Sequence, residues 1–129
     1  MHKEVVEERV QKAGEDYNAV LRLEPAETPY VICFHCQQCI EKYLKAFLAA
    51  NGESPAPIHD LILLNESATE YEKSLDEIFD SLDELNPYSV AVRYPRIIVT
   101  KEDADKAIKI LNDLRVKLRR LIDKITKEE

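Results

Sequence analysis

Residues 33–48 read CFHCQQCIEKYLKAFL, and this stretch decides the fold because its apolar and polar residues separate at helical spacing. Residues of the apolar side recur every three or four positions: Cys33, Cys36, Ile40, Tyr43, Leu44 and Phe47. The opposite side carries four polar side chains: His35, Gln38, Lys42 and Lys45. We therefore expect a helix that builds a core with one side and offers hydrogen-bonding groups with the other.

Helical patterns continue on both sides of this stretch. They predict a first helix over residues 3–23, ended before Pro25, and a second opened by Thr28 and Pro29 and stopped at residues 51–52. A third helix starts at His59 or Asp60, and a fourth covers residues 75–85. Residues 88–99 are expected to be irregular or extended, and residues 100–103 to form a capping box for a last helix over 104–125. Short loops between long helices favour an all-α, up-and-down antiparallel bundle of four main helices plus one shorter helix, in a single domain over residues 1–129.

Composition excludes several classes of protein. The net charge of -7 argues against a nonspecific nucleic-acid binder, which needs a positive field. No apolar run is long enough to span a bilayer and the N-terminus is charged from its second residue, so we expect no membrane helix, no signal peptide and a cytoplasmic location. Three cysteines within seven residues do not make a disulfide framework and fit a reducing compartment.

The three cysteines form a C-x-x-C-x-x-C string that admits two interpretations. The string could hold a metal or an iron-sulfur cluster, or act as a redox pair. A continuous helix, however, spreads positions 33, 36 and 39 around its axis, and a redox pair would need a βαβ context. Cysteine also packs well as a small hydrophobe. We therefore favour core packing and predict no metal site and no cofactor.

Three blocks of sequence resemble the HEPN domain family of small all-helical proteins. The first runs from Phe34 and His35 through Gln37, Gln38, Glu41 and Lys42 to Lys45 and Ala46; the others are residues 59–61 (HDL) and residues 93–95 (RYP). The resemblance covers residues 17–122 and implies a homodimer, a minimal nucleotidyltransferase as partner in a toxin-antitoxin pair, and binding of a nucleotide or RNA. Many members of the family are metal-independent ribonucleases that use an Arg, a polar spacer and a His at the start of the last helix. No His follows His59 here, so ribonuclease activity of that usual kind is not expected.

Arg93 and Tyr94 stand out because Pro95 favours an extended backbone at Tyr94 and so fixes how both side chains project. A guanidinium there could bind phosphate or carboxylate in a bidentate way, or could form a structural ion pair with Glu41. His35 could act as an acid, a base or a nucleotide contact, or could simply join the backbone or a second subunit by hydrogen bonds. For His59 we expect helix capping.

Three functional hypotheses follow. The first is a HEPN-like binding protein that recognises a nucleotide, an RNA or a nucleotidyltransferase through His35, Gln38, Lys42, Lys45, Arg93 and Tyr94. The second is a metal-independent ribonuclease in which His35 and Arg93 are catalytic, and the third is a purely homodimeric interaction module. Charge is also segregated, with eight acids against Lys73 over residues 66–84 and six bases against Asp123 over residues 115–127, a pattern suited to docking.

Overall fold

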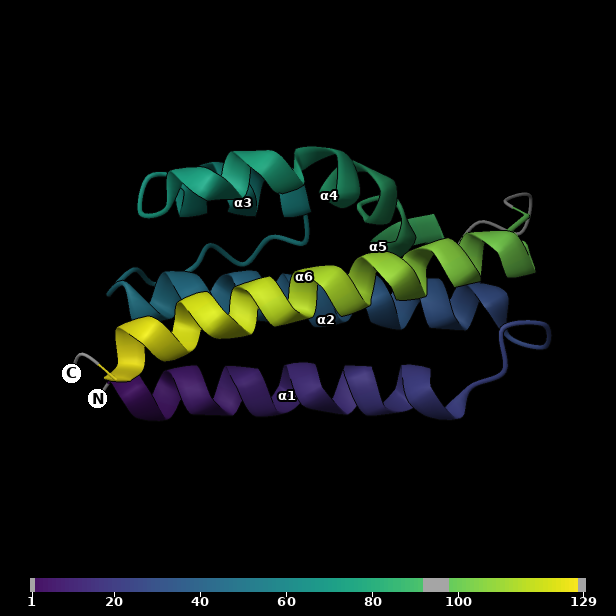
Figure 1. Cartoon of the computed structure of the whole chain (residues 1–129), viewed down its shortest axis with the longest axis horizontal. Helices are drawn as coiled ribbons and strands as arrows, with labels where there is room; N and C mark the ends of the chain where they lie inside the picture. The colour runs from purple at the N-terminus through teal and green to yellow at the C-terminus, as the bar shows by residue number, and fades with distance from the viewer. Residues whose placement is uncertain (1, 92–97, 128–129) are drawn as a thin grey trace.

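The computed structural model describes residues 2–91 and 98–127, and within them the chain is an all-α bundle (Figure 1). Arg93, Tyr94 and Pro95 lie outside the described residues. The elements are α1 (His2–Arg22), α2 (Pro29–Ala50), α3 (Leu61–Thr69), the 3-10 helix η1 (Lys73–Ile78), α4 (Phe79–Leu85), α5 (Tyr88–Ala91) and α6 (Lys101–Lys127). Helices α1 and α2 are antiparallel, α3 and the η1–α4 segment double back on each other, and α6 runs in the opposite direction to α1 (Figure 1), so the chain is the all-α bundle that the sequence predicts. The start of α1 and the end of α6 lie at the same end of the bundle.

Helix α2 is the centre of the fold because α1, α3 and α6 all pack against it. Fourteen residues between Ile32 and Ala50 are buried, and Tyr43, Leu44 and Phe47 are at most 1% exposed. Burying one large apolar side chain contributes about 1.5–3 kcal/mol before conformational entropy is subtracted. The predicted apolar side of α2 is thus the core of the protein.

Two helix ends, the end of α2 and the start of α6, follow the predicted capping signals. Gly52 adopts a positive φ of 84° directly after α2, and the N–H groups of Gly52 and Glu53 donate to carbonyls of the last turn of α2. At the start of α6, the Asp103 N–H donates to the Thr100 hydroxyl (3.2 Å) while the Thr100 N–H donates to the Asp103 carboxylate (2.9 Å). This reciprocal pair is the predicted capping box. Thr28 holds the N-cap position of α2 as expected, but its hydroxyl donates to the carbonyl of Glu24 instead.

Three predictions about the middle of the chain need correction. His59 does not cap α3: the cap is Asp60, whose carboxylate accepts from the N–H groups of Ile62 and Leu63, while the His59 ring turns back toward α2. The predicted fourth helix begins as the 3-10 helix η1, in which the two buried residues, Leu75 and Ile78, lie three positions apart.

The third correction concerns residues 88–91, which we expected to be irregular or extended. They form the short helix α5, which contacts α2. Pro87 precedes this turn, and its fixed φ suits the entry into a helix as well as the end of one.

Candidate functional site

Two carboxylates hold the polar side of α2 against the rest of the bundle. The first is Asp16 of α1, whose side chain is 9% exposed. One of its oxygens lies 2.8 Å from Nδ1 of His35, and the other accepts from Nζ of Lys42 at 2.5 Å. Asp16 therefore ties two of the predicted site residues to α1.

The second carboxylate is Glu41 of α2, whose side chain is 5% exposed. Nδ1 of His59 lies 3.0 and 3.2 Å from its two oxygens, and Nζ of Lys45 donates to one of them at 3.3 Å. Gln37, which is fully buried, donates to the carbonyl of His59 (2.9 Å) and approaches Glu41 (3.5 Å). Gln38 donates to the side-chain oxygen of Gln37 at 2.8 Å.

Both units have the same composition: a buried carboxylate, a histidine bound through Nδ1, and a lysine. In each, the carboxylate fixes the orientation of the imidazole ring and leaves Nε2 as the nitrogen free to meet another group. His59 is the more accessible, with 68% of its side chain exposed against 28% for His35. This arrangement can hold a proton-transfer group or an anion ligand in a fixed position.

Between α1 and α2 the surface is hollowed, with a volume of about 360 Å³. The hollow, which we call the α1/α2 hollow, is lined by Val5, Glu8, Arg9, Lys12, Glu41, Lys42 and Lys45. Four of these residues are cationic and two are anionic. Lys42 and Lys45, predicted from the sequence, thus meet two further cations that the α2 pattern alone does not reveal.

The structure brings together four of the six predicted ligand-binding residues on the side of α2 that faces α1 and the loop before α3: His35, Gln38, Lys42 and Lys45. The other two, Arg93 and Tyr94, lie outside the described residues. The first helix contributes three residues that sequence reasoning missed: Arg9, Lys12 and Asp16. Their spacing of three and four places them on one side of a helix, which is a signal that the sequence does contain.

The cysteine string lies in the core as expected, because Cys33, Cys36 and Cys39 are all 0% exposed. Burial raises the pKa of the Cys33 thiol to about 11 and that of Cys39 to about 12, and it raises the pKa of Cys36 further still. The Cys39 thiol donates to the carbonyl of Ala13 across the α1–α2 contact. All three thiols are therefore neutral near pH 7 and serve packing rather than nucleophilic chemistry.

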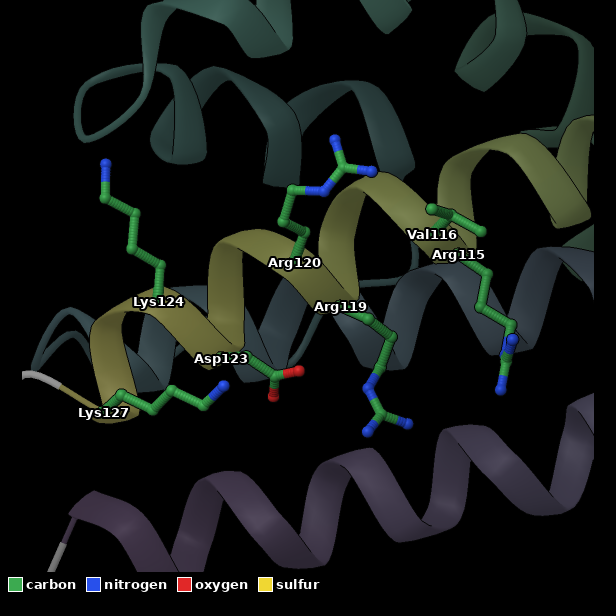
Figure 2. A pocket seen from close by; sticks show the side chains of 7 residues that line it. All are labelled: Arg115, Val116, Arg119, Arg120, Asp123, Lys124 and Lys127. Carbon is green, nitrogen blue, oxygen red and sulfur yellow. The ribbon is translucent and has the colours of Figure 1, made fainter.

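A second hollow, of about 670 Å³, lies on the surface of α6 (Figure 2). It is lined by Arg115, Val116, Arg119, Arg120, Asp123, Lys124 and Lys127, and we call it the basic groove. Figure 2 shows Arg115 and Arg119 extending toward α1, and Arg120 and Lys124 extending toward the α3 side. The Arg115 guanidinium stacks 4.0 Å from the centre of the Tyr17 ring, which fixes its position.

Comparison with protein-family models gives a match to the HEPN domain over residues 6–121, nine-tenths of the chain. The chain belongs to the HEPN domain family. No curated protein and no solved structure matched it in the corresponding comparisons. The match agrees with the three sequence blocks, two of which the structure joins directly: Glu41 of the first holds His59 of the second. In this HEPN protein no helix among the described residues has the length and apolar character needed to cross a membrane.

Proposed function

We propose that this HEPN protein binds a phosphate-bearing ligand, a nucleotide or the end of an RNA, in the α1/α2 hollow. The observation that carries the proposal is the convergence there of four cations from two helices: Arg9, Lys12, Lys42 and Lys45. Lysine and arginine are the side chains that proteins use to bind phosphate, arginine with two parallel hydrogen bonds and lysine as a point charge. An acidic protein with a net charge of -7 needs such a local concentration of positive charge to hold an anion.

The ion pairs in and beside the hollow support a site that is ready for a ligand. Lys42 and Lys45 are held in place by Asp16 and Glu41, so little side-chain freedom remains to be lost on binding. Within the described part of the chain, Lys12 forms only an exposed pair with Glu8 at 3.3 Å, which a phosphate can displace at small cost. Two positioned cations and one available cation suit a phosphate group.

We extend the proposal to the remaining residues selected from the sequence. His35 shares the carboxylate of Asp16 with Lys42, and we assign His35 and Gln38 to further contacts with the ligand. Arg93 and Tyr94 are assigned a guanidinium and an aromatic ring that recognise the phosphate and the base. A homodimer in the cytoplasm with a minimal nucleotidyltransferase as partner is the biological setting that the family suggests. No cofactor is required for this function.

The ligand is tested by titrating the protein with inorganic phosphate, ATP and two short RNAs of the same sequence, one with a 5′-phosphate and one with a 5′-hydroxyl. We expect the phosphorylated RNA or ATP to bind, and Lys12→Gln to weaken binding about tenfold, because one charge-assisted hydrogen bond is worth about 1.5–3 kcal/mol. Lys12 is exposed, so its replacement leaves the fold intact.

The matched control is Lys3→Gln, which removes the same charge from an exposed position of the same helix outside the hollow. Arg93→Ala is measured beside it. The proposal would be overturned if none of the four ligands bound, or if Lys12→Gln and Lys3→Gln lowered the affinity equally.

A second candidate function, a metal-independent ribonuclease, is favoured by the carboxylate–imidazole pair of Asp16 and His35. A buried carboxylate that holds Nδ1 makes Nε2 available as a general base toward a ribose 2′-hydroxyl, and Arg93 would stabilise the charge on the phosphate. Incubation of RNA with the wild-type protein, His35→Ala and Arg93→Ala tests this function. Cleavage that survives either substitution, or RNA that stays intact with the wild type, would refute it.

A further inference from the structure

The basic groove of α6 has two sides, and its cations divide between them. Figure 2 shows Arg115 and Arg119 extending toward α1, whereas Arg120 and Lys124 extend toward the α3 side. The side that faces α1 therefore carries two guanidinium groups from positions one helical turn apart. Side chains at this spacing are neighbours on the helix surface, about 5–6 Å apart at Cβ, so both guanidinium groups can reach one ligand.

These two guanidinium groups have no acidic partner in the part of the chain that the structure describes. None of the ion pairs there includes Arg115 or Arg119. Nε of each arginine is shielded from solvent and has no hydrogen-bond partner among the described residues. Both side chains line the groove and are partly exposed, so we place their terminal nitrogens at its surface.

Covering an unpartnered N–H group costs free energy, and here two such groups lie on the same side of one helix. Two lysines would supply the same positive charges without any Nε–H group to cover. The feature that needs a physical reason is therefore the planar fork of donors, which only arginine provides.

The orientation of one fork is already fixed. The Arg115 guanidinium stacks 4.0 Å from the centre of the Tyr17 ring, which joins α6 to α1. A stacked guanidinium uses its face, so the N–H donors in its plane stay available to an anion. The stack also restrains the rotamers of Arg115, and less side-chain entropy is then lost when a ligand binds.

The anion that matches two such forks is a phosphate with a double negative charge. Each guanidinium can donate two parallel hydrogen bonds to an anion. A carboxylate has two oxygens and one charge, which satisfy a single fork, whereas a phosphomonoester has three acceptor oxygens and a charge of about -1.5 to -2 at pH 7. Asp123 is the one acid among the seven lining residues and five of the others are cations, so the groove keeps a net positive charge.

We propose that Arg115 and Arg119 form a second anion site, which binds the phosphate group of a phosphomonoester or free phosphate on the side of the basic groove that faces α1. We call it the Arg115/Arg119 site. It shares no residue with the α1/α2 hollow, so it stands independently of the ligand proposed there.

Nuclear magnetic resonance of the full chain gives a direct readout, since shielding from solvent slows the exchange of the Nε–H protons with water. Arg115→Lys and Arg119→Lys assign the two Nε–H signals in proton–nitrogen correlation spectra. The probes are inorganic phosphate, glycerol phosphate, dimethyl phosphate and acetate at one ionic strength. We expect the first two to shift both signals to saturation. Dimethyl phosphate and acetate carry single charges and should leave the signals nearly unchanged.

Substitutions then separate the fork from its charge. Arg119→Gln should weaken glycerol phosphate binding, followed at the Arg115 signal, about tenfold, because bonds between two charged groups are the stronger kind. Arg119→Lys keeps the charge without the fork and should recover only part of that loss.

The matched control is Arg120→Gln, which removes the same charge from the adjacent residue that extends toward the α3 side. It should lower the affinity by less than about twofold, because salt screens charges that do not contact the ligand. Lys12→Gln, in the α1/α2 hollow, should leave the Arg115 and Arg119 shifts unchanged.

Four results would count against the Arg115/Arg119 site. They are signals that no anion shifts, equal shifts with acetate or dimethyl phosphate, equal losses of affinity for Arg119→Gln and Arg120→Gln, and full recovery of affinity by Arg119→Lys. Shifts that disappear in Lys12→Gln would also refute the proposal, because they would assign the effect of phosphate to the α1/α2 hollow.

Discussion

Replacing Asp16 by Asn tests whether the polar side of α2 is anchored by charge. The substitution keeps the size of the side chain and one acceptor oxygen but removes the negative charge that meets His35 and Lys42. Breaking a fully buried ion pair costs about 3–5 kcal/mol, whereas an exposed pair is worth about 0–1 kcal/mol. Asp16 is 9% exposed and its two partners are about one-third exposed (28% and 32%), so we expect a loss of about 2 kcal/mol in the free energy of unfolding.

For a chain of this size, about 2 kcal/mol corresponds to a fall in Tm of about 8 °C. Urea denaturation followed by circular dichroism measures the same loss of unfolding free energy, which should appear as a lower midpoint with an unchanged m-value. Lys42→Met in a double-mutant cycle with Asp16→Asn should give a coupling energy of about 1 kcal/mol, because the two residues share a contact.

The matched control is Asp105→Asn, which breaks a pair of similar length, 2.7 Å to Lys101, on the exposed side of α6. With about half of each side chain exposed (53% and 48%), this pair should contribute less than about 0.5 kcal/mol. Equal losses for Asp16→Asn and Asp105→Asn, or a coupling energy near zero, would show that the buried network does not hold α1 against α2 by charge.

Three further substitutions act on other parts of the core and its caps. Burial holds the thiol pKa values of the cysteines at about 11 and above in the folded chain, against about 8.5 when unfolded, so the free energy of unfolding should fall as pH rises from about 9 through 11. Urea titrations at a series of pH values measure this fall, and Cys36→Ala should make it shallower. The wild-type thiols should react slowly with a thiol reagent until the protein unfolds. Asp60→Ala should cost about 1 kcal/mol of stability because it removes the N-cap of α3, and Asp60→Ser should recover most of the loss; thermal denaturation of the pair measures both. Tyr43→Phe should leave stability unchanged or raise it by up to about 1 kcal/mol, because the buried hydroxyl has no hydrogen-bond partner among the described residues; a clear loss of stability in urea would point to a partner that the reasoning lacks.

The local features of this fold could be read from the sequence because they depend on residues close together in the chain. The two sides of α2 follow from apolar residues three or four positions apart, and the stop at Gly52 and the cap by Thr100 and Asp103 each involve neighbours within a few residues. The burial of the cysteines also follows, since they occupy the apolar side of that helix.

The partners of the polar residues could not be read in the same way, because they depend on how helices rotate about their axes when they pack. Asp16 is 19 residues from His35 and 26 from Lys42, and nothing local selects it over the other acids of α1. His59 illustrates the same limit. Its position before α3 favours a cap, but the packing of the loop on α2 gives it Glu41 instead, and Asp60 takes the cap.

The basic groove was visible in the sequence only as an excess of charge. Six bases over residues 115–127 do not reveal which of them find carboxylates. Packing of α6 beside η1 and α4 assigns Lys117 to Glu77 and Lys106 to Glu84, and it leaves the lining of the groove without ion pairs within the described chain. Fold class therefore follows from periodicity, whereas the candidate surfaces require the arrangement of helices in space.

The start of α1 and the end of α6 lie at the same end of the bundle (Figure 1), so the helices could be connected in a different order by circular permutation. A short linker could join the two ends, and new ends could be opened in the loop between α2 and α3, where residues 52–57 carry two prolines and a glycine and few backbone hydrogen bonds. Such a circular permutant would begin with α3 and finish with α2, so the helix at the centre of the core would be synthesised last. Its ability to fold would show that the packing around α2, rather than the order of synthesis, determines this architecture.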